Sequence, residues 1–530
     1  MTDPARLLVT AIRLDRDEPG TALEAALGDL EAGVGGFILF GGTCDTVRGL
    51  TAELRDRAGR PLWLSADLER GAGQQFRGAA TLPPPAALAS HPEPERAVRA
   101  AARLTAREAL DLGVNWVLAP VLDLDVEPRN PIVGTRSFGA EPALVSRLGR
   151  AWIGACQAAG AAACAKHFPG HGRTIGDSHM ELPSVGAPRE RLEDDLAPFR
   201  AVADVAAGMM AAHVAYPALG CEGPASRSPE VLRSLLRAEM GFDGLVVTDA
   251  LVMAGFGGGG ETGAATEGWR GVRALRAGCD ILLYPSDPAL VARTIRQAAG
   301  NDPRLARLVE EAAARSERAL ERFGSGETAG RRAAAAEVDE ADAGHSEASA
   351  AAPDLPLFRP GAPELTRLAA ECVRPAGAGG PEEAAREVAA WTAAAAGRVR
   401  IAVVSDDEAS DDAATGRALA AELARRGWSV EGQGEGPGAA PPGAGPLLVV
   451  IRATPRAEKG RSGLSGRARD RVAALLSADR PALPVALGHP RVLVEEGLAG
   501  LCAWSSEEVM ERGAAAWIAD RAKASGGGPA

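Results

Sequence analysis

Ionisable side chains are concentrated in one short stretch of the chain, KHFPGHGRTIGDSHMELP at residues 166–183. This stretch holds three of the seven histidines, and it holds Lys166 although only three of the 58 basic residues are lysines. Two prolines and three glycines in the same stretch predict a loop, and loops often carry binding and catalytic groups. We therefore expect a functional site here.

The tripeptide Asp177-Ser178-His179 has the spacing of an acid/base pair. In an extended loop, residues two positions apart point to the same side, so the Asp177 carboxylate can reach a ring nitrogen of His179. Such a carboxylate fixes the tautomer of the imidazole and raises its basicity, while the other ring nitrogen faces a substrate. The pattern predicts proton transfer from a loop that can move.

The same histidines could instead form a metal site, because three ring nitrogens and the Asp177 carboxylate match the ligands of zinc. His167 and His171 are four residues apart, a spacing that brings two ligands together on a helix. Pro169 and the adjacent glycines exclude a helix here, so we expect no metal. A third interpretation is that the histidines are hydrogen-bonded packing residues of the loop.

A second candidate, Asp249, ends the apolar run GLVVTD at residues 244–249. An aspartate in this position can cap the following helix, but at the mouth of a barrel it can also attack an electrophilic carbon. Four further polar residues complete a ring with it: Asp67, Asp123, Arg136 and His213. For Asp123 and His213, a structural role as a buried partner is an equally good interpretation. Charged groups that converge on one mouth predict a small, hydroxyl-rich ligand.

Eight short apolar runs, each followed by a helical pattern, supply the elements that position these residues. They lie at residues 7–12, 36–40, 62–67, 114–120, 162–168, 208–214, 244–249 and 280–285. Continuous apolar runs separated by helices indicate parallel strands covered on both faces, and eight of them predict a closed (β/α)8 TIM barrel. The alternative is an open, doubly wound sheet. The barrel is favoured because the polar candidates fall at the carboxyl ends of their runs, which a barrel gathers on one face.

The chain of 530 residues is too long for one compact core. Residues 1–325 form the predicted catalytic barrel, and residues 326–397 are expected to be a linker and helices. From residue 398 to residue 530 the alternation of strands and helices resumes on a smaller scale. The sequence therefore predicts an α/β protein, with a TIM barrel followed by a smaller doubly wound α/β sandwich domain.

Composition excludes several classes of function. A net charge of −12 provides no basic face for a nucleic acid. No apolar run reaches the roughly 18–20 residues that span a bilayer, and the charged amino-terminal residues do not form the core of a secretory signal. Seven scattered cysteines without a CxxC pair suit reduced thiols. We expect a cytoplasmic protein that needs no cofactor and binds a small carbohydrate; the sequence does not determine its oligomeric state.

The candidate residues lie in longer motifs that resemble glycoside hydrolase family 3, specifically its β-N-acetylglucosaminidase branch. The resemblance covers about residues 5–325, and the second domain is similar to the family's carboxyl-terminal α/β sandwich in its general pattern only. The matching motifs are KHFPGHG (166–172), DSH (177–179), LP (182–183), APVLD (119–123), RSFG (136–139) and TDA (248–250).

The resemblance implies a retaining double displacement in which Asp249 is the nucleophile and His179, oriented by Asp177, is the general acid and base. This differs from the two-carboxylate arrangement of most retaining glycosidases. The family also implies that the hydroxyl groups of the sugar are bound by Asp67, Arg136, Lys166 and His167, and we add His213 to this substrate-binding set.

The resemblance implies a retaining exo-β-N-acetylglucosaminidase that acts on small glycans, such as muropeptides in cell-wall recycling. A phosphorylase is an alternative, because a neutral histidine does not repel an incoming phosphate as a glutamate does. A sugar-binding protein without catalysis and a β-glucosidase are further alternatives. The chain departs from the family motif D-x-E-G-G-x-V-x-R, since Gln75 stands where the sugar-binding arginine is expected, with Arg70 and Arg77 as possible substitutes.

Overall fold

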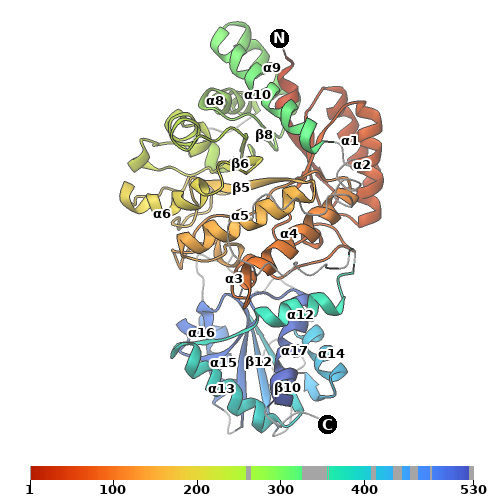
Figure 1. The fold of residues 1–530 in the computed structure, drawn as a ribbon, viewed down its shortest axis with the longest axis vertical. Helices are drawn as coiled ribbons and strands as arrows, with labels where there is room; N and C mark the ends of the chain where they lie inside the picture. The colour runs from red at the N-terminus through yellow and green to blue at the C-terminus, as the bar shows by residue number, and fades with distance from the viewer. Residues whose placement is uncertain are drawn as a thin grey trace, which may run out of the picture. The chain divides into compact units, whose positions relative to one another are not determined.

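The computed structural model describes residues 2–257, 264–324, 355, 357, 359–406, 414–433, 445–453, 464–477 and 480–524. The chain divides into two compact units (Figure 1). The first consists of Met1–Ala80, Val98–Glu127 and Ser137–Arg359, and the second of Thr81–Ala97, Pro128–Arg136 and Pro360–Ala530. Among the helices of the described residues, none combines the length and the apolar character needed to cross a membrane.

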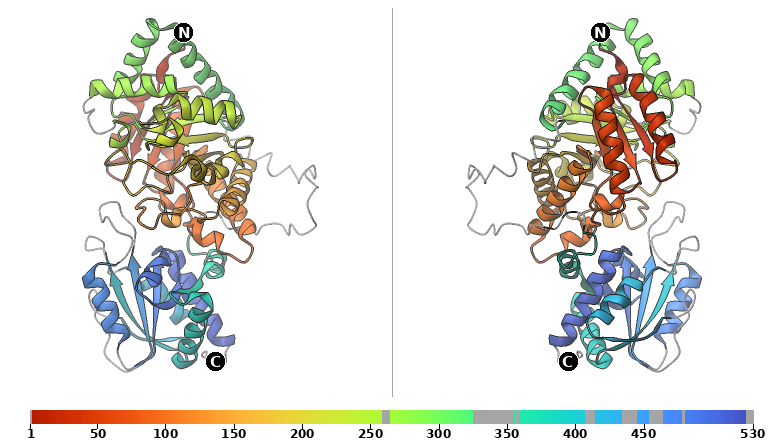
Figure 2. Two further views of the ribbon diagram at one scale, coloured as in Figure 1. Left: turned by 90° about the vertical axis from the view of Figure 1, so that its left-hand side faces the viewer. Right: turned by 90° about the vertical axis from the view of Figure 1, so that its right-hand side faces the viewer.

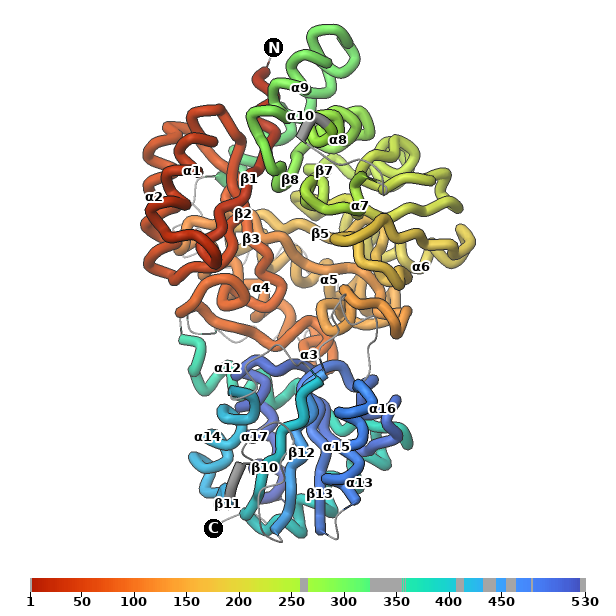
Figure 3. Tube along the Cα trace, turned by 180° about the vertical axis from the view of Figure 1, so that it is seen from behind, coloured from red at the N-terminus to blue at the C-terminus, as the bar shows by residue number. Residues whose placement is uncertain are grey.

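The first unit is built on eight parallel strands. They are β1 (Leu8–Arg13), β2 (Gly36–Phe40), β3 (Trp63–Ala66), β4 (Trp116–Val117), β5 (Ala162–Phe168), β6 (Gly208–Ala211), β7 (Leu245–Thr248) and β8 (Leu282–Leu283). Neighbours pair in the order β7-β6-β5-β4-β3-β2-β1-β8, and Figure 3 shows β8 beside β1. A hydrogen bond of 3.0 Å from the Thr248 amide to the Ile281 carbonyl links the two ends of this sheet. The eight predicted strands and the barrel are therefore confirmed.

Helices follow the strands and cover the barrel from outside, as Figure 2 shows for α1 and α2. Their caps explain several of the boundaries: Thr43 accepts a hydrogen bond from the Thr46 amide at the start of α2, and Gly59 ends α2 with a left-handed backbone. The helices are α1 (Pro19–Glu31), α2 (Cys44–Ala58), α4 (Pro94–Asp111), α5 (Pro142–Ala158), α6 (Arg189–Arg200), a π-helix at Glu230–Glu239, α7 (Ala254–Gly257), α8 (Ala264–Ala277), α9 (Pro288–Gly300) and α10 (Pro303–Phe323).

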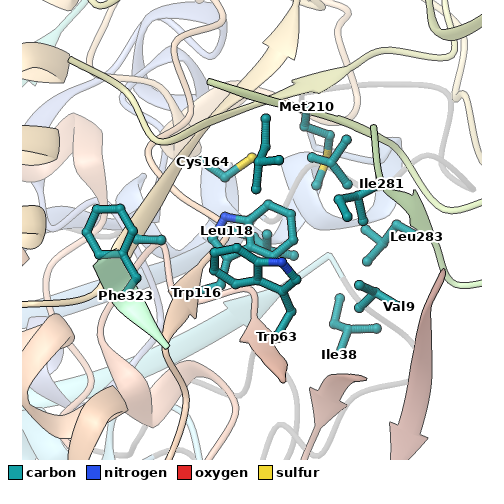
Figure 4. Close-up of a cluster of buried hydrophobic side chains, with 13 residues drawn as sticks. Val9, Ile38, Trp63, Trp116, Leu118, Cys164, Met210, Ile281, Leu283 and Phe323 are labelled. Atoms are coloured by element: carbon teal, nitrogen blue, oxygen red, sulfur yellow. The ribbon is translucent and has the colours of Figure 1, made fainter. Parts of the chain in front are cut away.

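The interior of the barrel is filled by buried apolar side chains, most of them from the strands (Figure 4). Trp63 and Trp116 are fully buried at its centre, with ring centroids 4.8 Å apart. The indole nitrogen of Trp63 donates a hydrogen bond of 2.9 Å to Ser316 of α10. A packed interior of this kind leaves the strand ends, rather than a central channel, to carry the site.

The second unit contains a six-stranded sheet in the order β11-β10-β12-β13-β14-β9, with helices on both faces (Figure 2). Five strands run parallel and β9 is antiparallel to β14. The strands are β9 (Arg374–Gly377), β10 (Arg398–Ser405), β11 (Ser429–Gln433), β12 (Leu447–Ala453), β13 (Ala482–Gly488) and β14 (Ala499–Cys502). The helices are α3 (Pro85–Ala89), α12 (Pro363–Cys372), α13 (Gly380–Ala395), α14 (Arg417–Arg425), α15 (Gly466–Leu476), α16 (Arg491–Glu495) and α17 (Glu508–Ala524).

The observed units differ from the predicted domain boundaries. Strand β9 and helices α12 and α13 lie within the predicted linker of 326–397, but the structure assigns residues from Pro360 onward to the second unit. Thr81–Ala97 and Pro128–Arg136 also belong to it, although the sequence places them in the barrel domain. Strand β9 is short and pairs with β14, which lies more than a hundred residues later in the sequence, so no local sequence pattern predicts it. Residues 326–354, 356 and 358 of the predicted linker lie outside the described residues.

Candidate active site

The candidate residues of the first unit lie at the carboxyl ends of the barrel strands. Lys166 and His167 are the fifth and sixth residues of β5, and Asp249 follows β7 directly. Asp67 follows β3, and His213 lies two residues beyond β6. Parallel strands in a barrel bring these ends together on one face, which is where active sites of barrel enzymes form.

Lys166 forms a buried ion pair with two carboxylates from the segment after β3. Its Nζ lies 2.6 Å from Asp67 Oδ1 and 2.7 Å from Glu69 Oε1, and its side chain is 2% exposed. Glu69 is buried as well, whereas the Asp67 side chain is 29% exposed. Buried charges persist when they are paired in this way, so Lys166 holds Asp67 in place while part of the Asp67 carboxylate stays accessible.

Asp123 connects both histidines of the KHFPGHG motif. Its Oδ2 lies 2.6 Å from His167 Nδ1, and its Oδ1 accepts backbone hydrogen bonds from His167 (3.1 Å) and His171 (2.6 Å). Burial raises the pKa of this carboxyl, but the adjacent His167 and the hydrogen bonds lower it by more, so the net pKa lies below the ordinary value. Asp123 is therefore an ionised, fully buried anchor for the loop that starts at the end of β5.

His171 supports the turn that follows. Its Nδ1 lies 2.7 Å from Thr174 Oγ1, and its Nε2 lies 3.1 Å from Ser178 Oγ. The Thr174 hydroxyl donates to the His171 carbonyl, so Nδ1 carries the ring proton and Nε2 accepts from Ser178. Burial lowers the pKa of His171 to about 4, which keeps the ring neutral near pH 7.

Asp177 and His179 form the predicted pair. Asp177 Oδ1 lies 2.7 Å from His179 Nδ1 and also accepts a hydrogen bond of 3.0 Å from the His179 amide. The Asp177 side chain is 13% exposed and the His179 side chain is 62% exposed. The carboxylate thus fixes the proton on Nδ1 and leaves Nε2 open to solvent or a ligand, as an acid/base catalyst requires.

Asp249 presents a carboxylate beside these histidines. Its Oδ1 accepts a hydrogen bond of 2.8 Å from the Ala250 amide, and its own amide donates to Ala211 of β6. Within the described residues, Oδ2 has no hydrogen-bond partner. Burial raises the pKa of Asp249, but the neighbouring His213 and His167 lower it by more, so the carboxylate is ionised at neutral pH. An ionised oxygen without a partner is suited to nucleophilic attack.

His213 has both ring nitrogens engaged by the protein. Nδ1 lies 2.7 Å from Ser226 Oγ, and Nε2 lies 3.1 Å from the carbonyl oxygen of Ala250. The ring is fully buried and packs edge-on against Phe256. Burial lowers its pKa, so the ring is neutral at pH 7, donates from Nε2 and accepts at Nδ1. His213 thus supports the segment after Asp249, and a direct contact with a sugar would require one of these bonds to break.

The sequence also singled out Arg136, and Gln75 and Arg77 at and near the position of the expected arginine. Arg136 ends a short 3-10 helix, donates a hydrogen bond of 3.2 Å to the Ile132 carbonyl and belongs to the second unit, so its role stays a prediction. Gln75 Oε1 accepts a hydrogen bond of 3.4 Å from the Gly41 amide, and Arg77 is exposed. In the described part of the chain, no His, Cys, Asp and Glu side chains form a group of three or more that could hold a metal ion.

Sequence reasoning missed three residues that the structure places in this cluster. Glu69 pairs with Lys166, Ser178 bonds to His171, and the Gly255 amide donates a hydrogen bond of 3.0 Å to the Ser178 carbonyl. The two-residue spacing of Asp67 and Glu69 was a signal that both could face one cation. Ser178 and Gly255 carry no such signal, because their contacts depend on how two loops approach each other.

A closed parallel barrel with ionisable groups gathered on its carboxyl-end face is the architecture of a TIM-barrel enzyme. Residues 24–318 match the model of the Glycosyl hydrolase family 3 N terminal domain. The chain therefore belongs to glycoside hydrolase family 3, and it is a glycoside hydrolase.

Known proteins are similar to this chain over different lengths of it. A beta-hexosaminidase of Alkalilimnicola ehrlichii is 38% identical over 281 residues, which are 51% of this chain and 79% of that protein. The solved structure of a family 3 beta-N-acetylglucosaminidase from a Paenibacillus species covers 98% of this chain and 97% of its own, with a TM-score of 0.74 and 24% identity. A beta-glucoside phosphorylase structure has a TM-score of 0.75 at 19% identity and covers 97% of this chain and 91% of its own.

Proposed function

We propose that this chain is a retaining exo-β-N-acetylglucosaminidase that removes terminal β-linked N-acetylglucosamine from small glycans. The observation that carries this proposal is a backbone link between the turn that holds Asp177 and His179 and the segment after Asp249. In this link, the Ala254 amide donates to the His179 carbonyl and the Gly255 amide donates to the Ser178 carbonyl. It supports a proton donor and a nucleophile that act on one bond. The hexosaminidase relative described above supports the choice of the sugar.

In the proposed first step, an oxygen of Asp249 attacks the anomeric carbon while Nε2 of His179 gives its proton to the leaving oxygen. The products are a covalent glycosyl-enzyme, the free aglycone and a neutral His179. In the second step, His179 takes a proton from water, the water oxygen bonds to the anomeric carbon, and the bond to Asp249 breaks. The enzyme returns to its starting state, and two inversions retain the anomeric configuration.

The binding of the sugar is proposed to use the carboxyl ends of β3 and β5. Asp67 is held by Lys166 and keeps part of its carboxylate accessible, so it can accept hydrogen bonds from sugar hydroxyl groups. The Nδ1 of His167 is held by Asp123, which leaves Nε2 for a hydroxyl group. Arg136 and His213 complete the predicted set. The proposed natural substrates are muropeptides that arise in the cytoplasm during cell-wall recycling.

Replacement of the two reacting residues tests this function. Asp249→Ala is expected to abolish release of nitrophenol from an aryl N-acetyl-β-glucosaminide, because it removes the carboxylate proposed to form the covalent intermediate. His179→Ala is expected to lower kcat/KM by about 100-fold or more on substrates whose leaving group needs a proton, and far less on activated aryl substrates. Retention of more than about a tenth of the activity by Asp249→Ala would contradict the nucleophile assignment.

Phosphorolysis is a second candidate, favoured by one feature of the site. The proton donor is a histidine, which lacks the negative charge that would repel phosphate as the second nucleophile. Turnover in phosphate buffer separates the two functions, because hydrolysis yields free N-acetylglucosamine and phosphorolysis yields its 1-phosphate. Accumulation of the sugar phosphate as the main product would replace the hydrolase proposal.

A further inference from the structure

We propose that Ser178 and Gly255 are positioning residues that hold the acid/base pair in register with the nucleophile. The inference rests on the proposed function, because it takes the roles of Asp177, His179 and Asp249 from it. Neither positioning residue supplies a reacting atom. Two segments are involved: the dyad turn, residues 177–181, and the post-nucleophile segment, residues 250–257.

The dyad turn is a tight unit with Ser178 on its inner side. The Asp177 carbonyl accepts hydrogen bonds of 3.0 Å from the amides of both Met180 and Glu181. Ser178 is 2% exposed, whereas the side chain of the next residue, His179, is 62% exposed. A buried hydroxyl therefore lies between the two residues of the proposed acid/base pair, where any shift of its backbone moves both.

A side-chain bond ties Ser178 to the loop after β5. The Ser178 hydroxyl lies 3.1 Å from Nε2 of His171, and the His171 amide is bound by Asp123 at 2.6 Å. Ser178, His171 and Asp123 are all at most 2% exposed. Hydrogen bonds between buried groups are costly to leave unmade, so this connection resists movement of the dyad turn away from the barrel.

A backbone bond ties Ser178 to the other side of the site. The Gly255 amide donates to the Ser178 carbonyl at 3.0 Å, and the Ala254 amide donates to the His179 carbonyl at 3.3 Å. Both donors belong to α7 in the post-nucleophile segment, six residues or fewer after Asp249. The position of the dyad turn is thus set by the same segment that carries the nucleophile.

Glycine is required at position 255 by the closeness of this approach. A Cβ there would lie 2.6 Å from the Ser178 carbonyl oxygen, 2.9 Å from the Glu181 carbonyl oxygen and 3.1 Å from Cβ of His213. Two of these atoms are backbone oxygens of the dyad turn, which cannot yield as the end of a flexible side chain can. An alanine at 255 would therefore push the dyad turn away from Asp249.

Such a displacement acts on proton transfer more than on the rest of the site. A catalytic group that moves by about 1 Å can lose roughly 100-fold in rate. The effect falls on bonds whose leaving oxygen must be protonated, and it spares leaving groups that depart as anions. This difference separates a positioning role from a general loss of structure, which would lower both kinds of reaction together.

The test compares Gly255→Ala and Ser178→Ala with wild type on two substrates of the full chain. The first is methyl N-acetyl-β-glucosaminide, whose leaving group needs a proton, and the second is the dinitrophenyl analogue, which does not. For the methyl glycoside we expect kcat/KM to fall about 100-fold in Gly255→Ala and about tenfold in Ser178→Ala, and for the aryl glycoside less than about threefold in either. The basic limb of the pH profile, where a general acid loses its proton, should shift in both variants.

Matched controls come from helix α5. Within the described residues, a Cβ at Gly154 would meet no atom within 4 Å, and Ser146 donates only to the Pro142 carbonyl. Gly154→Ala and Ser146→Ala should therefore leave both kcat/KM values unchanged. Amide hydrogen exchange of the peptide over residues 250–257 should be faster in Ser178→Ala than in wild type. If Gly255→Ala does not fold, Ser178→Ala still tests the inference through its kcat/KM values on the two substrates and the amide hydrogen exchange of residues 250–257.

His179→Ala distinguishes the two levels of the argument. If this variant loses activity selectively on the methyl glycoside but Ser178→Ala and Gly255→Ala lose activity equally on both substrates, or on neither, the positioning role is wrong and the proposed function stands. If His179→Ala shows no selective loss, its proposed acid role is wrong, and the positioning inference is overturned with it.

Discussion

Acidification should act on the site through His171, a buried histidine that supports the dyad turn. Burial lowers its pKa from the ordinary value of 6.5 to about 4. Its Nε2 accepts a hydrogen bond from Ser178, so protonation would place a second donor where an acceptor is needed. We therefore expect the folded protein to resist protonation of His171. When the ring is protonated at low pH, its hydrogen bond to Ser178 of the dyad turn should be lost.

The magnitude follows from the difference between the two pKa values. Between about pH 6.5 and pH 4, the unfolded chain binds a proton at His171 that the folded chain does not bind, so the free energy of unfolding falls as the pH falls. The stability contribution is complete above pH 6.5 and is lost by about pH 4. A difference of about 2.5 in pKa corresponds to about 3 kcal/mol.

A variant is needed to isolate this effect, because another buried group has the opposite sign. Burial raises the pKa of Asp195 from 3.8 to about 6, so the folded chain holds a proton there that the unfolded chain releases. That contribution is present below pH 3.8 and is lost as the pH rises through about 6. The two dependences offset each other in the wild type, and only the difference between wild type and His171→Gln reports on His171.

Two measurements check the prediction. In urea unfolding followed by tryptophan fluorescence, the stability difference between wild type and His171→Gln should shrink by about 3 kcal/mol from pH 7 to pH 4. In NMR spectra of the seven histidine rings, the His171 signal should not titrate above about pH 5. A His171 signal with a midpoint near 6.5, together with a stability difference independent of pH, would refute the reasoning.

Two further predictions concern the barrel itself. Asp280 is buried and forms ion pairs with Arg237 at 2.6 Å and with Arg315 at 2.8 Å, so Asp280→Ala removes the carboxylate from both pairs. We expect the free energy of unfolding, measured in urea, to fall by about 3 kcal/mol. A fall of less than about 1 kcal/mol would contradict this prediction. Trp63→Ala removes a fully buried ring that packs on Trp116. We expect about 4 kcal/mol of destabilisation from the cavity, measured by thermal unfolding, and an unchanged melting temperature would show that the site collapses without cost.

Much of the barrel could be predicted from the sequence because its signals are local. The apolar runs that become β1 to β8 are continuous stretches followed by helical patterns, and each strand forms at the predicted place. Asp249 and His167 could be placed at strand ends for the same reason. The contact of Asp177 with His179 needs only a two-residue spacing, and the structure contains it at 2.7 Å.

The tertiary structure alone decided which groups are engaged and which are free. Asp123 accepts hydrogen bonds from two loop residues that are more than forty positions away in the sequence. Glu69, which follows β3, forms an ion pair with Lys166 of β5. Both ring nitrogens of His213 form hydrogen bonds with other residues of the protein. The fit of Gly255 against the dyad turn is likewise invisible in sequence. These contacts join segments that are distant along the chain, and they exist only once closure of the barrel sets the distances between strand ends. The amino-acid sequence thus determined the chemistry available to this protein, and the closed barrel determined which atoms remain available for it.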